Sequence, residues 1–277
     1  MAEKLALKPL GNGENMQWEC FAAKAQNAQK SITIAIVGNL NNNEKAYLNI
    51  NEALKICGWH CNTNVVLKHI ASNKVHSGNV EEMLFDADAI IAAPGIASKG
   101  IEGYIEALRW CRTNNIPTLG IALGMQCMAI ELARNVLGLA DANTTEVNAN
   151  VTHNVVDLML EQKQMAYMPE SIRLGVYPCH LMHSSLAAKA YGGLSANERH
   201  RHRMEFNTKY RDLMLQAGVI FSGITPNAGL VDIIEVANNQ WYLGCSFQPE
   251  LSCTAFAPNK LLMSFIDAAN YNKEQKQ

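Results

Sequence analysis

The stretch that decides the fold is Pro117-Thr-Leu-Gly-Ile-Ala-Leu-Gly-Met-Gln126. Its first half is an apolar run typical of a buried strand, and a helical pattern starts directly after the turn around Ala122. Gly120 and Gly124 flank this turn and permit close packing around one residue in a strained backbone conformation. The stretch therefore predicts a strand–turn–helix elbow that presents Ala122 above the carboxyl end of a sheet, where α/β folds place their sites.

Strands and helices alternate around this elbow. The sequence predicts strands at 31–38, 63–69, 87–93 and 117–121, and helices at 44–57, 79–85, 100–114 and 124–137, with Gly58 just past the end of the first helix. Further strands are expected at 172–182, 202–206, 218–224, 229–236 and 240–247, and a final helix at 259–271. The expected fold is α/β: a three-layer α/β/α sandwich with a mostly parallel central sheet and added antiparallel strands.

The chain is expected to form one domain over residues 31–271. Residues 1–30 are interpreted as an N-terminal helical extension, because Trp18 and Phe21 share one face at helical spacing. Residues 272–277 are interpreted as a charged tail.

Composition narrows the class of protein. The 277 residues are 48% hydrophobic and 17% charged, with a formal net charge of −2, so the chain can bury a core and carries no global field for nucleic acid or an anionic membrane. No apolar run is long enough to span a bilayer, and the first residues lack the apolar region of a signal peptide. We therefore expect a cytoplasmic protein.

The eight cysteines are too few and too scattered for a disulfide scaffold. Cys57 and Cys61 approach each other most closely in sequence, but no second half of a zinc site accompanies them. Cys127, Cys245 and Cys253 are also interpreted as core thiols, since no histidine stands at a recognisable position to activate them. No metal and no cofactor is expected.

Six stretches along the chain carry specific sequence motifs: Ile34–Gly38, Pro94-Gly95, Gly120–Gln126, Asp141-Ala-Asn-Thr-Thr-Glu146, Glu198-Arg-His-Arg-His-Arg203 and Phe247–Glu250. In this order they resemble the glutamine amidotransferase domain of the CTP synthase family, a class I or triad amidotransferase. This resemblance implies the fold above and a pocket for glutamine. The family's amidoligase half carries a phosphate-binding loop, and no G-x-x-x-x-G-K-[ST] occurs in these residues. We therefore expect a stand-alone relative that does not make CTP by itself.

Two positions of the family's catalytic triad differ in this sequence. By resemblance, Ala122 stands at the position of the triad cysteine and Gln248 at that of the triad histidine. Glu250 stands at the position of the triad glutamate, which this sequence keeps. Amide hydrolysis by this route needs a thiolate to attack the carboxamide carbon and an imidazole to move a proton. A methyl group and a carboxamide supply neither function, so no glutaminase activity is expected.

The loop that supplies backbone N–H donors to the oxyanion in the family also differs. Gly95 is kept, but Ile96 replaces the second glycine, which makes a peptide flip costly and brings a branched side chain to the oxyanion hole. An engineered Cys→Ala change would explain Ala122 alone, so a natural loss of function is favoured.

The residues that contact the amino-acid end of glutamine in the family are present. They correspond to Gln126, Glu146 and Arg203. Arg203 suits an α-carboxylate and Glu146 suits an α-ammonium group. For Arg199 and Arg201 the choice between ligand binding and a solvated or internally paired strand stays open.

Three functions remain open on the sequence alone. The first is a pseudo-glutaminase that binds glutamine or a related amino acid and acts as a sensor or regulator of a partner, such as a CTP synthase or another amidoligase. The second is an enzyme that uses Glu250, Glu146 and water for a cysteine-independent reaction on an amide or nucleotide-derived substrate. The third is a non-catalytic interaction module. The sequence names neither the physiological ligand nor the oligomeric state, and a homo-oligomer stays open.

Overall fold

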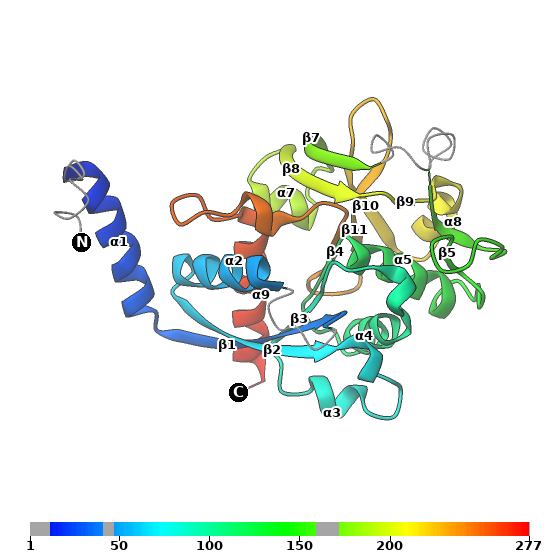
Figure 1. Cartoon of the computed structure of the whole chain (residues 1–277), viewed down its shortest axis with the longest axis horizontal. Coiled ribbons are helices and arrows are strands. Elements are labelled where there is room, and N and C mark those ends of the chain that lie inside the picture. Colours follow the sequence, from blue (N-terminus) through cyan, green and yellow to red (C-terminus); the bar gives the residue numbers. More distant parts are fainter. Residues whose placement is uncertain (1–11, 41–46, 159–171, 277) are drawn as a thin grey trace, which may run out of the picture.

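The computed structural model describes residues 12–40, 47–158 and 172–276, with side chains described from residue 16 onward. In this part of the chain a nine-stranded sheet runs through the molecule in the order β2-β1-β3-β4-β12-β11-β10-β7-β8 (Figure 1). Its strands are β1 (Lys30–Gly38), β2 (Thr63–Ala71), β3 (Ala89–Ala92), β4 (Thr118–Ile121), β7 (Arg173–Leu181), β8 (Ser195–His202), β10 (Val219–Ile224), β11 (Val231–Val236) and β12 (Tyr242–Cys245).

The two halves of this sheet differ in strand direction. Strand β1 pairs in parallel with both β2 and β3, and β4 pairs in parallel with both β3 and β12. From β12 onward every pairing is antiparallel, through β11, β10 and β7 to the edge strand β8. A second, small sheet joins β5 (Asn143–Thr144), β6 (Asn154–Asp157) and β9 (Glu205–Phe206). The predicted α/β fold with added antiparallel strands is confirmed.

Helices cover both faces of the large sheet because its parallel strands are apolar on both sides. In β1, Ile34 and Ile36 face one core cluster, and Ala35 and Val37 face the other. The first cluster lies under α2 (Leu48–His60), α7 (Leu186–Tyr191) and α9 (Lys260–Gln275); the second lies under α3 (Val80–Leu84), α4 (Glu102–Thr113), α5 (Leu123–Asn135) and α8 (Arg211–Gln216).

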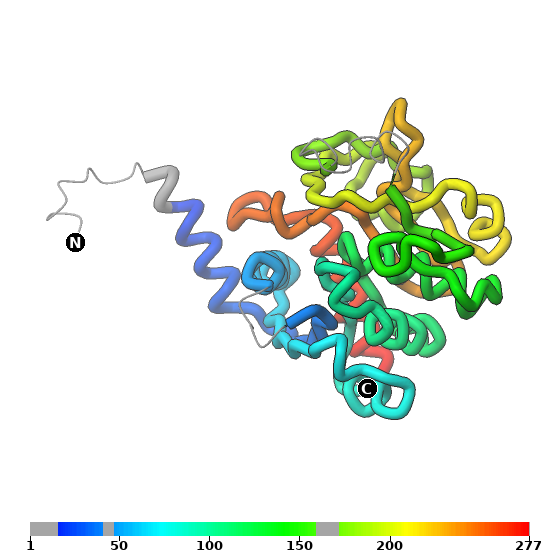
Figure 2. Tube along the Cα trace, turned by 45° about the vertical axis from the view of Figure 1, so that its right-hand side comes forward, coloured from blue at the N-terminus to red at the C-terminus, as the bar shows by residue number. Residues whose placement is uncertain are grey.

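Helix α1 (Asn12–Asn27) projects from this sandwich, as both views show (Figures 1 and 2). Its contacts with the body are mainly aromatic, with one polar contact between Lys24 Nζ and His60 Nδ1 at 3.0 Å. The Trp18 ring lies 4.7 Å from Phe256, and the Phe21 ring lies 5.5 Å from Trp59 on α2, both edge to face. The loop after residue 252 is thereby placed between α1 and α2.

Three sequence expectations need correction. Gly58 does not end α2 but lies buried within its last turn, where a side chain would collide with the Thr63 carbonyl. The strand expected at 202–206 is β8, which ends at His202, followed by the short β9. The final helix continues to Gln275, because Asn272 donates to the Asp88 carbonyl and Lys273 to the Ser31 carbonyl, which fixes its last turn to the sheet.

Among the helices in the described part of the chain, none combines the length and the apolar composition that crossing a bilayer requires.

The start of α5 packs against the backbone of β3. A Cβ atom at Gly124 would overlap the carbonyl oxygen of Ala92, and a Cβ atom at Gly120 would overlap the backbone of Gly124. Backbone atoms cannot move aside as a flexible side chain can, so these two glycines set the distance between helix and sheet.

We expect Gly124→Ala to lower the free energy of unfolding by about 1–3 kcal/mol, because the added methyl group overpacks a rigid contact. Gly193→Ala is the matched control, since a Cβ atom there meets nothing within 4 Å. Urea denaturation of both variants measures the effect. Equal stability of the two variants would contradict a fixed helix–sheet distance.

Candidate functional site

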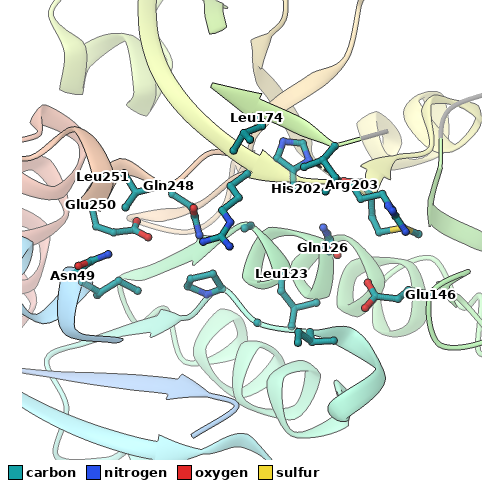
Figure 3. Close-up of a pocket in the computed structure, with 18 of the residues that line it drawn as sticks. Asn49, Leu123, Gln126, Glu146, Leu174, His202, Arg203, Gln248, Glu250 and Leu251 are labelled. Carbon is teal, nitrogen blue, oxygen red and sulfur yellow. Dashed lines mark hydrogen bonds between the residues drawn. The ribbon is translucent and has the colours of Figure 1, made fainter. Parts of the chain in front are cut away.

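A cleft of about 1050 Å³ opens above the carboxyl ends of the parallel strands. All eight residues predicted for the site line it: Gly95, Ile96, Ala122, Gln126, Glu146, Arg203, Gln248 and Glu250. Figure 3 shows Gln248 and Glu250 on one side, Glu146 and Arg203 on the other, and Gln126 between them. The structure therefore brings together segments that are more than 150 residues apart in the sequence.

The elbow has the strained backbone that the sequence predicts. Ala122 has φ 51° and ψ −104°, outside the regions that alanine normally adopts. Its N–H donates to the Cys245 carbonyl at 2.8 Å, and its carbonyl accepts from the Gln126 N–H at 3.1 Å. These two bonds tie the elbow to β12 and to the first turn of α5, so neighbouring structure holds the strained conformation in place.

The loop after β3 forms another wall of the cleft. Ile96 is extended, with φ −121°, and 49% of it is exposed. Its N–H donates to the side-chain oxygen of Asn39 at 3.1 Å. Asn39 is itself held by Tyr104, whose hydroxyl accepts from the Asn39 N–H at 3.1 Å. The Ile96 N–H is therefore already used within the protein.

Gln248 and Glu250 come from the segment after β12. The Gln248 N–H donates to the Arg199 carbonyl at 2.9 Å, which attaches this segment to the edge strand β8. Glu250 follows in the short 3-10 helix η7 (Pro249–Ser252) and is only 7% exposed. Asn49 and Ile50, at the start of α2, line the cleft beside them.

Glu250 is a buried carboxyl group with an unused oxygen. Its Oε2 atom has no hydrogen-bond partner among the described residues. Burial raises the pKa of Glu250 from 4.5 to about 7, its own backbone N–H opposes this rise, and the charge of Glu198 adds to it. The group therefore exchanges its proton close to neutral pH.

Glu198 is buried behind the cleft but fully hydrogen-bonded. It accepts from the Tyr191 hydroxyl at 2.7 Å, from Ser252 at 2.7 Å and from Asn259 at 2.8 Å. These three bonds join α7, η7 and the start of α9 around one carboxylate. Glu198 is thus a structural group that holds the Glu250 segment in place.

His202, which the sequence analysis did not assign to the site, also lines the cleft. Its Nδ1 lies 3.1 Å from the Met204 carbonyl, which only accepts, so Nδ1 carries the proton. Its Nε2 then accepts from Nδ1 of His200 at 2.9 Å. Both ring nitrogens of His202 are therefore occupied.

Burial and the charge of Arg173 lower the pKa of His200 to about 2 and that of His202 to about 4. Both imidazoles are therefore neutral near pH 7. Arg203 is assigned from the family resemblance, and strand alternation places His202 on the face opposite to Arg201, so the sequence carries no signal for His202. Arg201 lines the cleft as well, whereas the side chain of Arg199 does not.

Gln126, Glu146 and Arg203 leave their polar groups open to the cleft. Glu146 and Arg203 are exposed and Gln126 is half-buried. None of these three side chains hydrogen-bonds to another protein group within the described residues, and neither does that of Gln248. A cation, an anion and two carboxamides are thus available to a polar ligand.

Arg173 behaves differently from these open groups. It is buried and bonded to Asp232 at 2.9 Å and to Thr225 at 2.9 Å, and it lies 3.4 Å from Glu205.

Cys127 is buried, and burial raises the pKa of its thiol, as expected for a core cysteine. Within the described ranges no group of three or more His, Cys, Asp or Glu side chains is arranged to hold a metal ion.

Comparison with known proteins agrees with this geometry. The model of the family "Glutamine amidotransferase class-I" matches residues 41–268. The chain belongs to this family.

The curated relatives of this class I amidotransferase include CTP synthases. It is 45% identical to the CTP synthase of Porphyromonas gingivalis over 265 residues, which are 95% of this chain and 49% of that protein. It is 41% identical to the CTP synthase of Flavobacterium psychrophilum over 278 residues, or 99% of this chain and 52% of that protein. The chain therefore spans about half the length of these relatives.

A solved structure supports the same assignment. The glutaminase domain of Trypanosoma brucei CTPS with bound acivicin matches with a TM-score of 0.81 and 30% identity, covering 86% of this chain and 93% of that one. The chain is thus a CTP synthase-like glutamine amidotransferase domain.

The raised pKa of Glu250 predicts a specific pH dependence of stability. The folded protein keeps this proton up to about pH 7, whereas the unfolded chain releases it near 4.5. The wild type should therefore lose stability relative to Glu250→Gln as pH rises from 5 to 8, by up to about 3 kcal/mol. Urea denaturation of both proteins across this range measures the difference, and parallel pH profiles would contradict the assignment.

Proposed function

We propose that this amidotransferase domain is a pseudo-glutaminase: it binds glutamine or a related amino acid in the cleft without hydrolysing it, and so acts as a sensor or regulator. The observation that carries the proposal is the elbow itself. The strained backbone at Ala122 presents a methyl group to a cleft whose polar groups are open.

The lack of hydrolysis follows from the groups around the elbow. A thiolate is needed at position 122 and a proton-transferring base beside it, and Ala122 and Gln248 supply neither. His202 does not replace the missing base, because both of its nitrogens are already hydrogen-bonded and its pKa lies at about 4. Cys127 does not replace the nucleophile, because it is fully buried.

The oxyanion hole supports the same proposal. In the family this loop offers backbone N–H donors to the developing negative charge. Here the Ile96 N–H is bonded to Asn39, and the exposed Ile96 side chain stands in the cleft. A tetrahedral intermediate would therefore lose one of its donors even if a nucleophile were present.

Ligand binding is proposed at the opposite end of the cleft. Arg203 would meet the α-carboxylate, Glu146 the α-ammonium group, and Gln126 would donate to or accept from the same end of the ligand. Both charges are exposed and unpaired within the described residues, so a ligand would have to displace only water from them. One charge of each sign in the same cleft favours a zwitterionic ligand.

The regulatory role would be exercised on a partner. We propose residues 31–271 as the ligand-binding unit, acting in the cytoplasm on a CTP synthase or another amidoligase. The resemblance to the glutaminase half of CTP synthases supports this partner class. A homo-oligomer is compatible with the proposal.

Calorimetric titration with L-glutamine, and with acivicin as a second probe, should give a saturable isotherm with no continuing heat and no released glutamate. Arg203→Ala and Glu146→Gln should weaken binding at least about tenfold, since each removes a charged hydrogen bond. Arg199→Ala, an arginine on the adjoining strand β8 whose side chain does not line the cleft, is the matched control and should bind as the wild type does. Glutamate release at ordinary rates would overturn the pseudo-glutaminase, and flat traces with both probes would favour a non-catalytic interaction module.

Restoring the family residues tests whether their replacement accounts for the lost chemistry. Ala122→Cys alone should release no glutamate above background, because the thiol lacks a base and a complete oxyanion hole. The triple variant Ala122→Cys/Gln248→His/Ile96→Gly should exceed it at least about tenfold. The same triple variant with Ala122→Ser keeps the shape without a thiolate and serves as the control. Equal rates for the single and triple cysteine variants would show that Gln248 and Ile96 play no part in the loss.

One observation favours a second candidate function. Glu250 combines an unused buried oxygen with a pKa of about 7, which suits a group that gives and takes a proton near neutral pH. With Glu146 and water it would act on an amide or nucleotide-derived substrate without a cysteine. A substrate whose turnover disappears in Glu250→Gln would select this candidate.

A further inference from the structure

Two cysteines that lie 196 positions apart in the sequence meet beside the cleft. The Sγ atoms of Cys57 and Cys253 are 3.6 Å apart, close enough for a hydrogen bond between the two thiols. Cys57 lies in the last turn of α2, and Cys253 directly follows η7. The two thiols therefore bridge two separate walls of the site.

The two members of this pair differ in access to solvent. Cys57 is completely buried and also contacts the Asn259 carbonyl, with its Sγ at 3.7 Å. Cys253 is half-buried, so a small reagent can reach it. An accessible thiol backed by a buried one is the arrangement in which the first is attacked or oxidised and the second resolves the product.

The pKa values of the two thiols also favour Cys253 as the reactive member of the pair. A hydrogen bond from the Cys57 thiol lowers the pKa of Cys253 to about 7, against an opposing effect of burial. Six other cysteines have raised pKa values, with burial among the leading causes. Cys253 is thus the half-accessible thiol whose reactive thiolate form is favoured near neutral pH.

We propose that Cys57 and Cys253 form a reversible disulfide, and that this bond clamps η7 to α2 and thereby restrains the cleft. The inference does not depend on which ligand occupies the cleft. It revises the interpretation of Cys57 and Cys253 as inert core thiols.

The exchange needs only a small-molecule disulfide such as oxidised glutathione. The Cys253 thiolate attacks one sulfur of the reagent; the reagent's S–S bond breaks, a mixed disulfide forms at Cys253, and one glutathione leaves and takes up a proton. Cys57 then loses its proton and attacks the Cys253 Sγ, so that a second glutathione leaves and is protonated. Two protein thiols are oxidised to one disulfide, and one oxidised glutathione is reduced to two thiols.

The backbone at Cys253 can accommodate the bond. The two sulfurs must approach from 3.6 Å to about 2.0 Å. Cys253 lies outside regular structure, with φ −85° and ψ 131°, so it can shift without breaking a helix. Cys61, which directly follows α2, is a poorer partner for Cys57, because Cβ atoms four residues apart at helical spacing are about 5–6 Å apart, beyond the usual span of a disulfide.

The clamp would act directly on groups of the cleft. Glu250 and Leu251 in η7 and Asn49 and Ile50 in α2 all line it. Further contacts already join the two segments: the Cys253 Sγ lies 3.9 Å from the Ala53 carbonyl. His60, the last residue of α2, also lies with its Nε2 2.9 Å from the Ala255 carbonyl. A covalent bond at this place would therefore add a stronger restraint to two walls that hydrogen bonds already join.

Incubation of the whole chain in glutathione buffers of increasing oxidised fraction, followed by non-reducing peptide mapping, tests the bond. The wild type should yield a peptide cross-linked between Cys57 and Cys253, two hydrogen atoms lighter than the two free peptides together. Cys61→Ala and Cys20→Ser are the controls and should form the same cross-link; Cys20, which is exposed, takes up glutathione independently of it. Cys57→Ala should instead retain one glutathione at Cys253, and Cys253→Ala should leave Cys57 unmodified.

A bond between Cys57 and Cys61, modification of Cys57 in Cys253→Ala, or an unmodified Cys253 in Cys57→Ala would each overturn the assignment. Hydrogen exchange tests the clamp separately. Backbone amides of η7, such as that of Leu251, should exchange about tenfold more slowly in the oxidised wild type than in the reduced protein. An unchanged exchange rate in fully oxidised protein would overturn the restraint on the cleft.

Discussion

The approach of α5 to β3 is the contact on which the site depends. Gly124 places helix backbone against the Ala92 carbonyl, at a distance that leaves no room for a Cβ atom. A helix held this close to the sheet can begin only after a very tight turn, and that turn forces the backbone of Ala122 into its unusual conformation. The cleft exists because the elbow stands at its floor and the segments after β3 and β12 rise around it.

Buried polar groups form a second layer of support behind this elbow. In the antiparallel half of the sheet, Arg173 is bonded to Asp232 and Thr225, which joins β7 to β11 and to the end of β10. The paired rings of His200 and His202 are held neutral by their burial and by the arginine charge. Hydrogen-bonded polar groups of this kind fix a unique arrangement of strands, because any slip would leave charges buried without partners.

The parallel half of the fold was predictable from the sequence because its signals are local. Apolar runs such as 31–38 and the glycines around Ala122 directly reflect buried strands and a tight turn. The placement of Gln126, Glu146 and Arg203 in one cleft came from the family resemblance, and the geometry agrees with it. The roles of these residues stay predictions.

Features that depend on contacts between residues far apart in the chain could not be predicted from the sequence. The extension of α9 beyond Tyr271 depends on the carbonyls of Ser31 in β1 and of Asp88 just before β3. The hydrogen bonds of both His202 nitrogens depend on Met204 and on the protonated nitrogen of His200. The meeting of Cys57 with Cys253 is the extreme case, since neither neighbourhood hints at the other. The short helices α7 and α8 carry too few turns to give a periodic signal.

The backbone conformation of the elbow also restricts which residue types are tolerated at position 122 during evolution. A side chain there must tolerate a φ of 51° and fit a place that is 94% enclosed, so branched and bulky residues are disfavoured whatever the protein does. The residues that remain are small and unbranched at Cβ, a set that contains alanine, serine and cysteine alike. Changes at this position therefore stay among inert and reactive side chains of similar size, and the elbow presents any of them at the same point of the cleft.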